Sequence, residues 1–110
     1  MTIETTSKGK AIVIKLGGRL DAESTPQFNA ACESLIRSGA LHMVLDLAAL
    51  DYISSAGLGS ILRLAKKLEE LGGAALLCGL RGLVREVFEV TNLLSLFKVF
   101  DSPEDACGTI

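Results

Sequence analysis

Short apolar runs alternate with segments of helical periodicity along this chain, and this alternation limits its possible folds more than any other feature. The runs have the length of buried strands and are rich in Val, Ile and Leu: AIVIKL at 11–16, HMVLDL at 42–47 and AALLC at 74–78. Strands that alternate with helices form parallel sheets through right-handed crossovers. The sequence therefore predicts an α/β fold.

Both ends of the chain add a strand to this pattern. Residues 2–7 and the run at 11–16 are separated only by Lys8-Gly9-Lys10, which predicts an antiparallel hairpin at one edge of the sheet. SLFKVF at 95–100 is predicted as a short last strand. With 110 residues the chain has room for one domain, 1–110. We expect one mostly parallel, mixed sheet of about five strands and about four helices, in the order ββαβαβαβα.

Capping residues and glycines mark the ends of the predicted helices. Ser, Thr or Asp precedes a helix, Pro suits its first turn, and Gly follows its last residue. The first predicted helix starts at the N-cap candidates Ser24 and Thr25, has Pro26 in its first turn and ends near Gly39. The second is an amphipathic helix at 56–71 that ends at Gly72-Gly73, and the third lies at 82–92. A terminal helical turn starts with Pro103, after Asp101 or Ser102 as the cap.

Charge, the length of the apolar runs and cysteine spacing exclude several classes of protein. A formal net charge of −2 predicts no direct nucleic-acid contact, because a phosphate backbone demands clustered Lys and Arg. The apolar runs fall far short of the ~20 residues that cross a bilayer, and the N-terminus lacks a signal region. We therefore expect a cytoplasmic protein without a membrane partner. Cys32, Cys78 and Cys107 lack CxxC or Cys/His spacing, which predicts neither metal, disulfide nor cofactor.

The segment after the second of these runs is the candidate functional site. In open α/β sheets, partner sites lie beyond the carboxyl ends of the strands. In this chain, Ser54 and Ser55 occupy such a place, directly before the predicted helix at 56–71. A helix N-terminus carries about half a positive charge, so it favours a phosphorylated serine, and Gly57 and Gly59 leave room for another protein's backbone. The alternative is structural. In it, Ser54 or Ser55 is only an N-cap and the glycines allow close packing on the sheet.

Four segments carry a resemblance to a known family. YISSAGLG at 52–59 resembles the phosphorylation loop of the STAS domain in anti-sigma-factor antagonists. GGRLDAES at 17–24 is similar to the family's strand-to-helix loop with its acidic residue, VLDLAALDYI at 44–53 to its central strand, and NLLSLFKVFDSPEDA at 92–106 to its closing segment. The segments share the family's order and spacing and span nearly the whole chain.

The resemblance implies a regulatory cycle of partner switching. In the family, the unphosphorylated domain binds an anti-sigma factor that is also a serine kinase, and this frees the sigma factor. Phosphorylation of the loop serine reverses the binding, and a PP2C-type phosphatase resets the cycle. The resemblance therefore implies two partners, the anti-sigma factor kinase and the phosphatase, for a protein that we expect to be a monomer when free.

The family's acceptor serine falls on Ser55, with Ser54 as the alternative acceptor. The family often has Asp before the acceptor and Ser or Thr after it, whereas this chain has Ser54 and Ala56. Asp21 matches the acidic residue of the neighbouring loop, where it either orients the acceptor hydroxyl or a partner cation, or forms an Asx-turn or cap. The predicted partner surface consists of Asp21, Ser54, Ala56, Gly57, Leu58, Gly59 and Arg63.

Two other interpretations are compared with partner switching. An enzyme needs a nucleophile and a base, but His42 is the only histidine and starts an apolar run, so we expect no catalytic residues. The second is a STAS interaction subunit of a lipid-transport or signalling complex in which Ser55 is never phosphorylated. Arg63, Lys66 and Lys67 either join a partner surface or form a plain solvated helix face.

Overall fold

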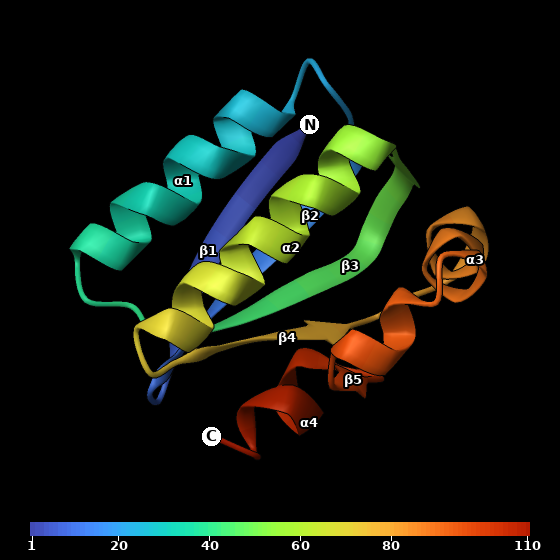
Figure 1. Ribbon diagram of the computed structural model, residues 1–110. Coiled ribbons are helices and arrows are strands. Elements are labelled where there is room, and N and C mark those ends of the chain that lie inside the picture. The colour runs from blue at the N-terminus through green and yellow to red at the C-terminus, as the bar shows by residue number, and fades with distance from the viewer.

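Five strands form one sheet in which each strand lies beside its neighbours in sequence (Figure 1). The computed structural model describes residues 1–110. β1 and β2 are antiparallel and all later pairs are parallel, which confirms the predicted mixed α/β sheet. The elements are β1 (Thr2–Lys8), β2 (Ala11–Leu20), α1 (Thr25–Arg37), β3 (His42–Ile53), α2 (Ser55–Glu70), β4 (Ala74–Cys78), α3 (Gly82–Val90), the 3₁₀ helix η1 (Leu93–Leu96), β5 (Val99–Phe100) and α4 (Pro103–Cys107).

The two faces of the sheet are covered unequally. α1 and α2 lie side by side across one face (Figure 1), and the main core forms there from residues such as Phe28 of α1, Ile61 of α2 and Leu45 of β3. On the other face, Ala106 of α4 packs in a smaller cluster with Val44 of β3. Because both faces of β3 are covered, its sequence is a continuous apolar run.

β2 and β3 run beyond their predicted ends. β2 continues through the Gly17-Gly18 pair to Leu20, and β3 continues past Leu47 to Ile53, so the strand ends predicted at Leu16 and Leu47 are both wrong. The register of the β2–β3 pair shifts on both sides of the glycines, and Gly18 has a φ of +87°. The glycines therefore form an irregularity within a strand. Burial of Leu20 and Ile53 in the core stabilises the extension.

The helix that follows β3 closely matches its prediction. α2 begins at Ser55 and ends at Glu70, one residue earlier at each end than expected. Gly72, with a φ of +87°, terminates it in the left-handed conformation that favours glycine. None of the helices combines the length and apolar character needed to cross a membrane.

The C-terminal region departs most from the sequence prediction. Instead of a strand at 95–100, the chain forms η1 and then the two-residue β5. Asn92 has a φ of +60°, which ends the preceding helical segment and turns the chain. Phe97 then packs edge-to-face on Phe88, with ring centroids 6.3 Å apart. In α4, Ser102 is the N-cap, because its hydroxyl accepts a hydrogen bond from the Asp105 N–H at 3.2 Å.

Candidate functional site

Two loops meet at the carboxyl edge of the parallel strands. The loop from β2 to α1 and the start of α2 lie at the same end of the molecule (Figure 1). Leu20 and Ile53, the last residues of β2 and β3, are register partners. Beyond them, the Ser54 N–H donates to the Leu20 carbonyl at 3.0 Å. The start of α2 is therefore fixed to the end of β2 by a backbone hydrogen bond.

Ser54 and Ser55 have different environments. Ser54 is the N-cap of α2: its backbone is extended, and its hydroxyl oxygen accepts a hydrogen bond from the Gly57 N–H at 3.2 Å. It is half-buried, whereas Ser55 is the first helical residue and is exposed, as is Ala56. The capping role that the sequence left open between the two serines belongs to Ser54. The Ser55 hydroxyl points to a surface that another protein can reach.

The two glycines of α2 also differ. Gly57 is buried, and a Cβ built on it would lie 2.5 Å from the Leu20 carbonyl oxygen, so this position allows close packing on β2. Leu58 is 8% exposed and belongs to the main core. Gly59 is half-buried, and a Cβ there would meet only the flexible end of the Arg63 side chain, at 3.3 Å. Gly57 and Leu58 thus shape the site from below, and Ser55, Ala56, Gly59 and Arg63 lie on its outer side.

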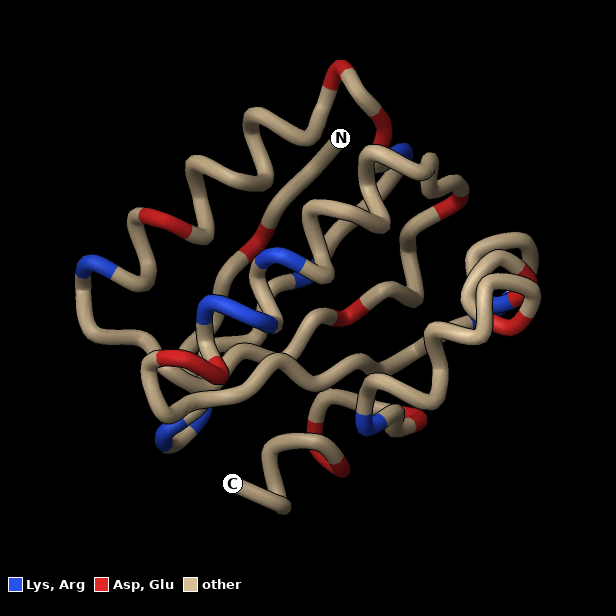
Figure 2. The backbone as a smooth tube through the Cα atoms, in the orientation of Figure 1, with Lys and Arg blue, Asp and Glu red and all other residues tan.

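The electrostatics at the start of α2 favour an anion. The first turn contains no acidic residue, and α2 carries no charged residue before Arg63, as the tan tube in Figure 2 shows. The aligned peptide dipoles of this 16-residue helix place a partial positive charge at its N-terminus. A phosphate attached to Ser55 would therefore lie in a favourable field.

Asp21 closes the turn that leads into α1. Its Oδ1 accepts hydrogen bonds from the N–H groups of Glu23 at 3.1 Å and Ser24 at 3.2 Å. Ser24 occupies the N-cap position of α1 but has helical φ and ψ and makes no side-chain cap bond. The side-chain cap expected from Ser24 or Thr25 is therefore not formed, and the Asp21 carboxylate instead accepts from two N–H groups that precede the helix. This geometry is that of the Asx-turn alternative.

The same contacts hold Asp21 in its ionised form. Desolvation acts to raise its pKa, but hydrogen bonds from Ser24 and Glu23 and the charge of Arg19 together outweigh it. The pKa of Asp21 therefore lies below its ordinary value. The nearest part of Arg19, its Nε, is 3.6 Å from Oδ2.

Arg19 and Tyr52 are surface residues of this site that sequence reasoning missed. They are register partners at the ends of β2 and β3, and the Arg19 guanidinium carbon lies 4.1 Å from the centre of the Tyr52 ring. Such cation–π stacking fixes both side chains at the edge of the site. The signal was hidden because the sequence predicted both strands to end before these residues.

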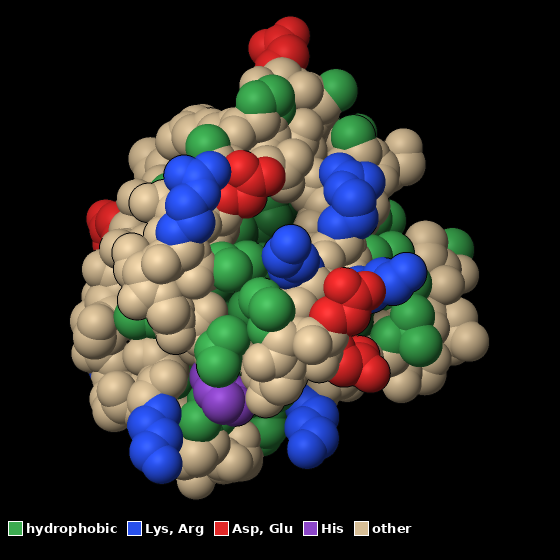
Figure 3. Space-filling view, turned by 60° about the vertical axis from the view of Figure 1, so that its left-hand side comes forward, with side chains coloured by type: hydrophobic (Ala, Val, Ile, Leu, Met, Phe, Trp, Pro, Cys, Tyr) green, Lys and Arg blue, Asp and Glu red, His purple; other side chains and the backbone are tan.

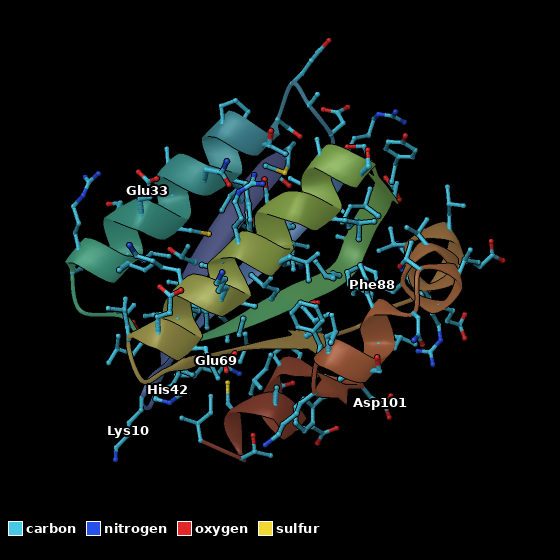
Figure 4. All side chains as sticks on the ribbon, viewed as in Figure 1. Lys10, Glu33, His42, Glu69, Phe88 and Asp101 are labelled. Atoms are coloured by element: carbon cyan, nitrogen blue, oxygen red, sulfur yellow. The ribbon has the colours of Figure 1, made fainter.

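The only histidine and the two cysteines with raised pKa values lie away from the Ser55 hydroxyl or are buried. Figure 4 places His42 at the start of β3, at the opposite end of the sheet from the N-terminus of α2. Desolvation, together with nearby negative groups, raises the pKa of Cys32 and Cys78 to about 12, so neither thiol ionises at neutral pH. No cluster of three or more His, Cys, Asp or Glu side chains could hold a metal ion.

Comparison with known proteins identifies the family. The family model described as the STAS domain matches residues 2–106. The chain belongs to the STAS domain family. This STAS protein is 41% identical to BtrV of Bordetella bronchiseptica, a candidate anti-sigma factor antagonist, over 88% of this chain and 84% of that one. It is 27% identical to the anti-sigma-B factor antagonist of Staphylococcus aureus, over 94% and 96% of the two chains.

A solved structure supports the fold of this STAS protein. The phosphorylated form of SpoIIAA, a Bacillus cell fate determinant, superposes with a TM-score of 0.76 at 24% identity, and the match covers 98% of each chain. The resemblance of 52–59 and its neighbouring segments to anti-sigma-factor antagonists is thus confirmed at the level of family and fold.

Proposed function

We propose that this STAS protein is an anti-sigma factor antagonist that works by partner switching through Ser55. In its unphosphorylated form it binds an anti-sigma factor that is also a serine kinase, and the sigma factor is released to act in the cytoplasm. Phosphorylation of Ser55 reverses this binding, and a PP2C-type phosphatase restores it. The observation that carries the proposal is the exposed Ser55 hydroxyl at the positive end of α2.

Ser55 is a better acceptor than Ser54 for a structural reason. The Ser54 hydroxyl caps α2 through the Gly57 N–H, and loss of an N-cap typically costs about 1 kcal/mol of stability. A kinase would have to remove Ser54 from this bond and from its half-buried position. Ser55 is already exposed, so its hydroxyl can enter a kinase active site while α2 stays intact.

The proposed switch is electrostatic and local. Phosphorylation adds about −1.5 to −2 charges and three strong acceptors. In the free protein, the N-terminus of α2 stabilises this charge. In a packed interface without a matching cation, the same charge loses its hydration water, and this desolvation costs binding free energy. A cost of only ~1.4 kcal/mol makes the complex tenfold weaker.

The partner surface that we propose lies on the outer side of the α2 N-terminus. Ser55, Ala56 and Arg63 are exposed and supply direct contacts, and half-buried Gly59 lets a partner backbone approach. Gly57 and Leu58 contribute indirectly, because both are buried. Asp21 supports the neighbouring loop and forms an ion pair with Arg19. Arg19 also stacks on Tyr52, and both residue types are enriched at binding hot spots, so we include the pair in the partner surface.

Two substitutions at Ser55 test the switch against the non-phosphorylated alternative. The protein is incubated with ATP and a candidate serine kinase chosen from its genomic neighbourhood, and any phosphate is located by mass spectrometry. Ser55→Ala should bind the kinase as the wild type does and take up no phosphate, whereas Ser55→Asp should bind at least about tenfold more weakly.

Ser54→Ala is the matched control for these variants. We expect it to lower stability by about 1 kcal/mol through loss of the cap and still to be phosphorylated at Ser55. Phosphate on Ser54 in the wild type, or equal kinase binding by Ser55→Ala and Ser55→Asp, would contradict the proposed switch. No phosphate with any candidate kinase would favour a STAS interaction subunit.

A further inference from the structure

A groove between α1 and α2 lies apart from the Ser55 hydroxyl. It has a volume of about 410 Å³ and is lined by five residues of α1 between Asn29 and Arg37 and by four residues of α2 between Ser60 and Lys67. Figure 3 shows this side of the molecule, with Lys and Arg side chains around a hollow in which apolar side chains are visible. Neither the phosphorylation site nor the capped turn at Asp21 contributes to its lining. The groove shares only Arg63 with the proposed partner surface around Ser55.

The groove is positively charged in a protein that is negative overall. Its lining has three cations, Arg37, Arg63 and Lys67, and one carboxylate, Glu33, which gives 3 − 1 = +2, against −2 for the whole chain. Glu33 lies 3.6 Å from Arg37 and compensates that cation. Arg63 and Lys67 of α2 then remain as the cations without a carboxylate in the lining. Charge complementarity therefore favours an anionic ligand in this groove.

The floor of the groove is largely apolar. Cys32, 4% exposed, and Leu64, 6% exposed, form part of it. Burial, together with the Glu33 charge, raises the pKa of the Cys32 thiol to about 12, so the thiol stays neutral. The polar exception is Ser60, which is 1% exposed and whose hydroxyl oxygen accepts a hydrogen bond from Nη2 of Arg63 at 3.1 Å. This bond holds the Arg63 guanidinium over the groove.

We propose that this groove binds a small organic phosphate with an apolar body. The body would lie on Cys32 and Leu64, and the phosphate would meet Arg63 and Lys67. The α2 segment from Ser60 to Lys67, which contains the lining residues of this helix, spans only about 12 Å, at ~1.5 Å per residue. Its volume falls in the range of small-molecule sites. These dimensions favour a compact ligand over an extended acidic segment of a protein.

Phenyl phosphate and inorganic phosphate are matched probes for this site. They carry the same anionic group, and only the first has an apolar body. In a titration followed by amide chemical shifts, phenyl phosphate should give saturable changes centred on 32–36 and 60–67, with an affinity at least about tenfold above that of inorganic phosphate. Equal, non-saturating effects of both probes, or stronger binding of a tetraglutamate peptide, would overturn the proposal.

Neighbouring lysines on α2 provide the variants. Lys67 lines the groove, whereas Lys66 is equally exposed on the same helix and does not. Lys67→Gln should weaken binding of phenyl phosphate about tenfold, and Lys66→Gln should leave it unchanged. Equal losses from the two variants would show attraction to general surface charge and would contradict a defined site. Because Ser55 is intact in both, phosphorylation of the same variants reports separately on the proposed switch.

Discussion

At the scale of single residues, the start of α2 contains some residues that stabilise the fold and others that are accessible to a partner. Ser54 and Gly57 bond to each other and fix the helix on β2, so their side chains, or the lack of one, are needed for the fold. Ser55 is exposed, and half-buried Gly59 lies one turn further along the same side of the helix. Substitutions at Ser54 and Gly57 should therefore affect mainly stability, and substitutions at Ser55 mainly partner binding.

The two glycines of α2 should respond to alanine with opposite signs. In Gly57→Ala, the new Cβ meets the Leu20 carbonyl oxygen at 2.5 Å, and backbone cannot yield easily, so we expect a loss of about 1–3 kcal/mol. In Gly59→Ala, the new Cβ meets only the end of the Arg63 side chain, so the higher helix propensity of alanine should add about 0.5–1 kcal/mol. Urea unfolding of both variants measures the difference. Destabilisation by both would contradict the packing that we describe.

Asp21 should make stability depend on pH in the acid range. Its folded pKa is lowered, so its contribution is fully present above the ordinary value of 3.8 and is lost as pH falls through the lower, folded value. Asp21→Asn should therefore have a lower Tm than the wild type near neutral pH, and the two Tm values should converge in strong acid.

Glu23→Gln is the control for this pH dependence. Glu23 is exposed on the same loop and takes part in the turn only through its backbone N–H. Its Tm should follow that of the wild type at every pH. A constant gap between Asp21→Asn and the wild type down to strong acid would show that the charge of Asp21 is not what stabilises the loop.

At the scale of elements, the sequence predicted well where periodicity and burial agree. The apolar stripe of α2 and its terminal glycine placed the helix to within one residue. The prediction of the end of β2 was wrong, because a Gly-Gly pair is typical of a strand end, whereas Gly17-Gly18 lies inside the strand. The sequence prediction failed again at Phe97, which lies in an apolar run but packs on Phe88 instead of extending in the sheet. For the candidate site, the sequence alone is enough to propose Ser55, whereas the pairing of Arg19 with Tyr52 required the strand register.

The C-terminal elements should open before the rest of the fold. α4 has five residues and β5 has two, and the cluster that α4 covers has six buried residues against nineteen in the main core. Native-state hydrogen exchange should therefore show lower protection for the Ala106 amide than for that of Leu45 in β3. Equal protection of the two amides would show that α4 unfolds only with the whole molecule.

At the scale of the whole molecule, the site lies at the edge of a compact domain. The radius of gyration is 12.5 Å, close to the ~13 Å expected for a compact domain of about 100 residues. The main core joins α1, α2 and the sheet. A charge added at Ser55 enters solvent and not this core. If Ser55 is phosphorylated as we propose, the added charge would therefore act on the surface of the domain and not on its core.

Ser55→Asp should therefore change the surface and leave the fold as it is. We expect amide chemical shifts to change around residues 20–24 and 52–60 only, with a stability change within about 1 kcal/mol, because a charge at a helix N-terminus is favourable. Ser34→Asp adds the same charge at an exposed position of α1 and should leave kinase binding intact. Shift changes that reach β4, α3 or α4 in Ser55→Asp would mean that the switch repacks the domain. In that case loss of partner binding would follow from a change of shape, and not from an unpaired charge in the interface.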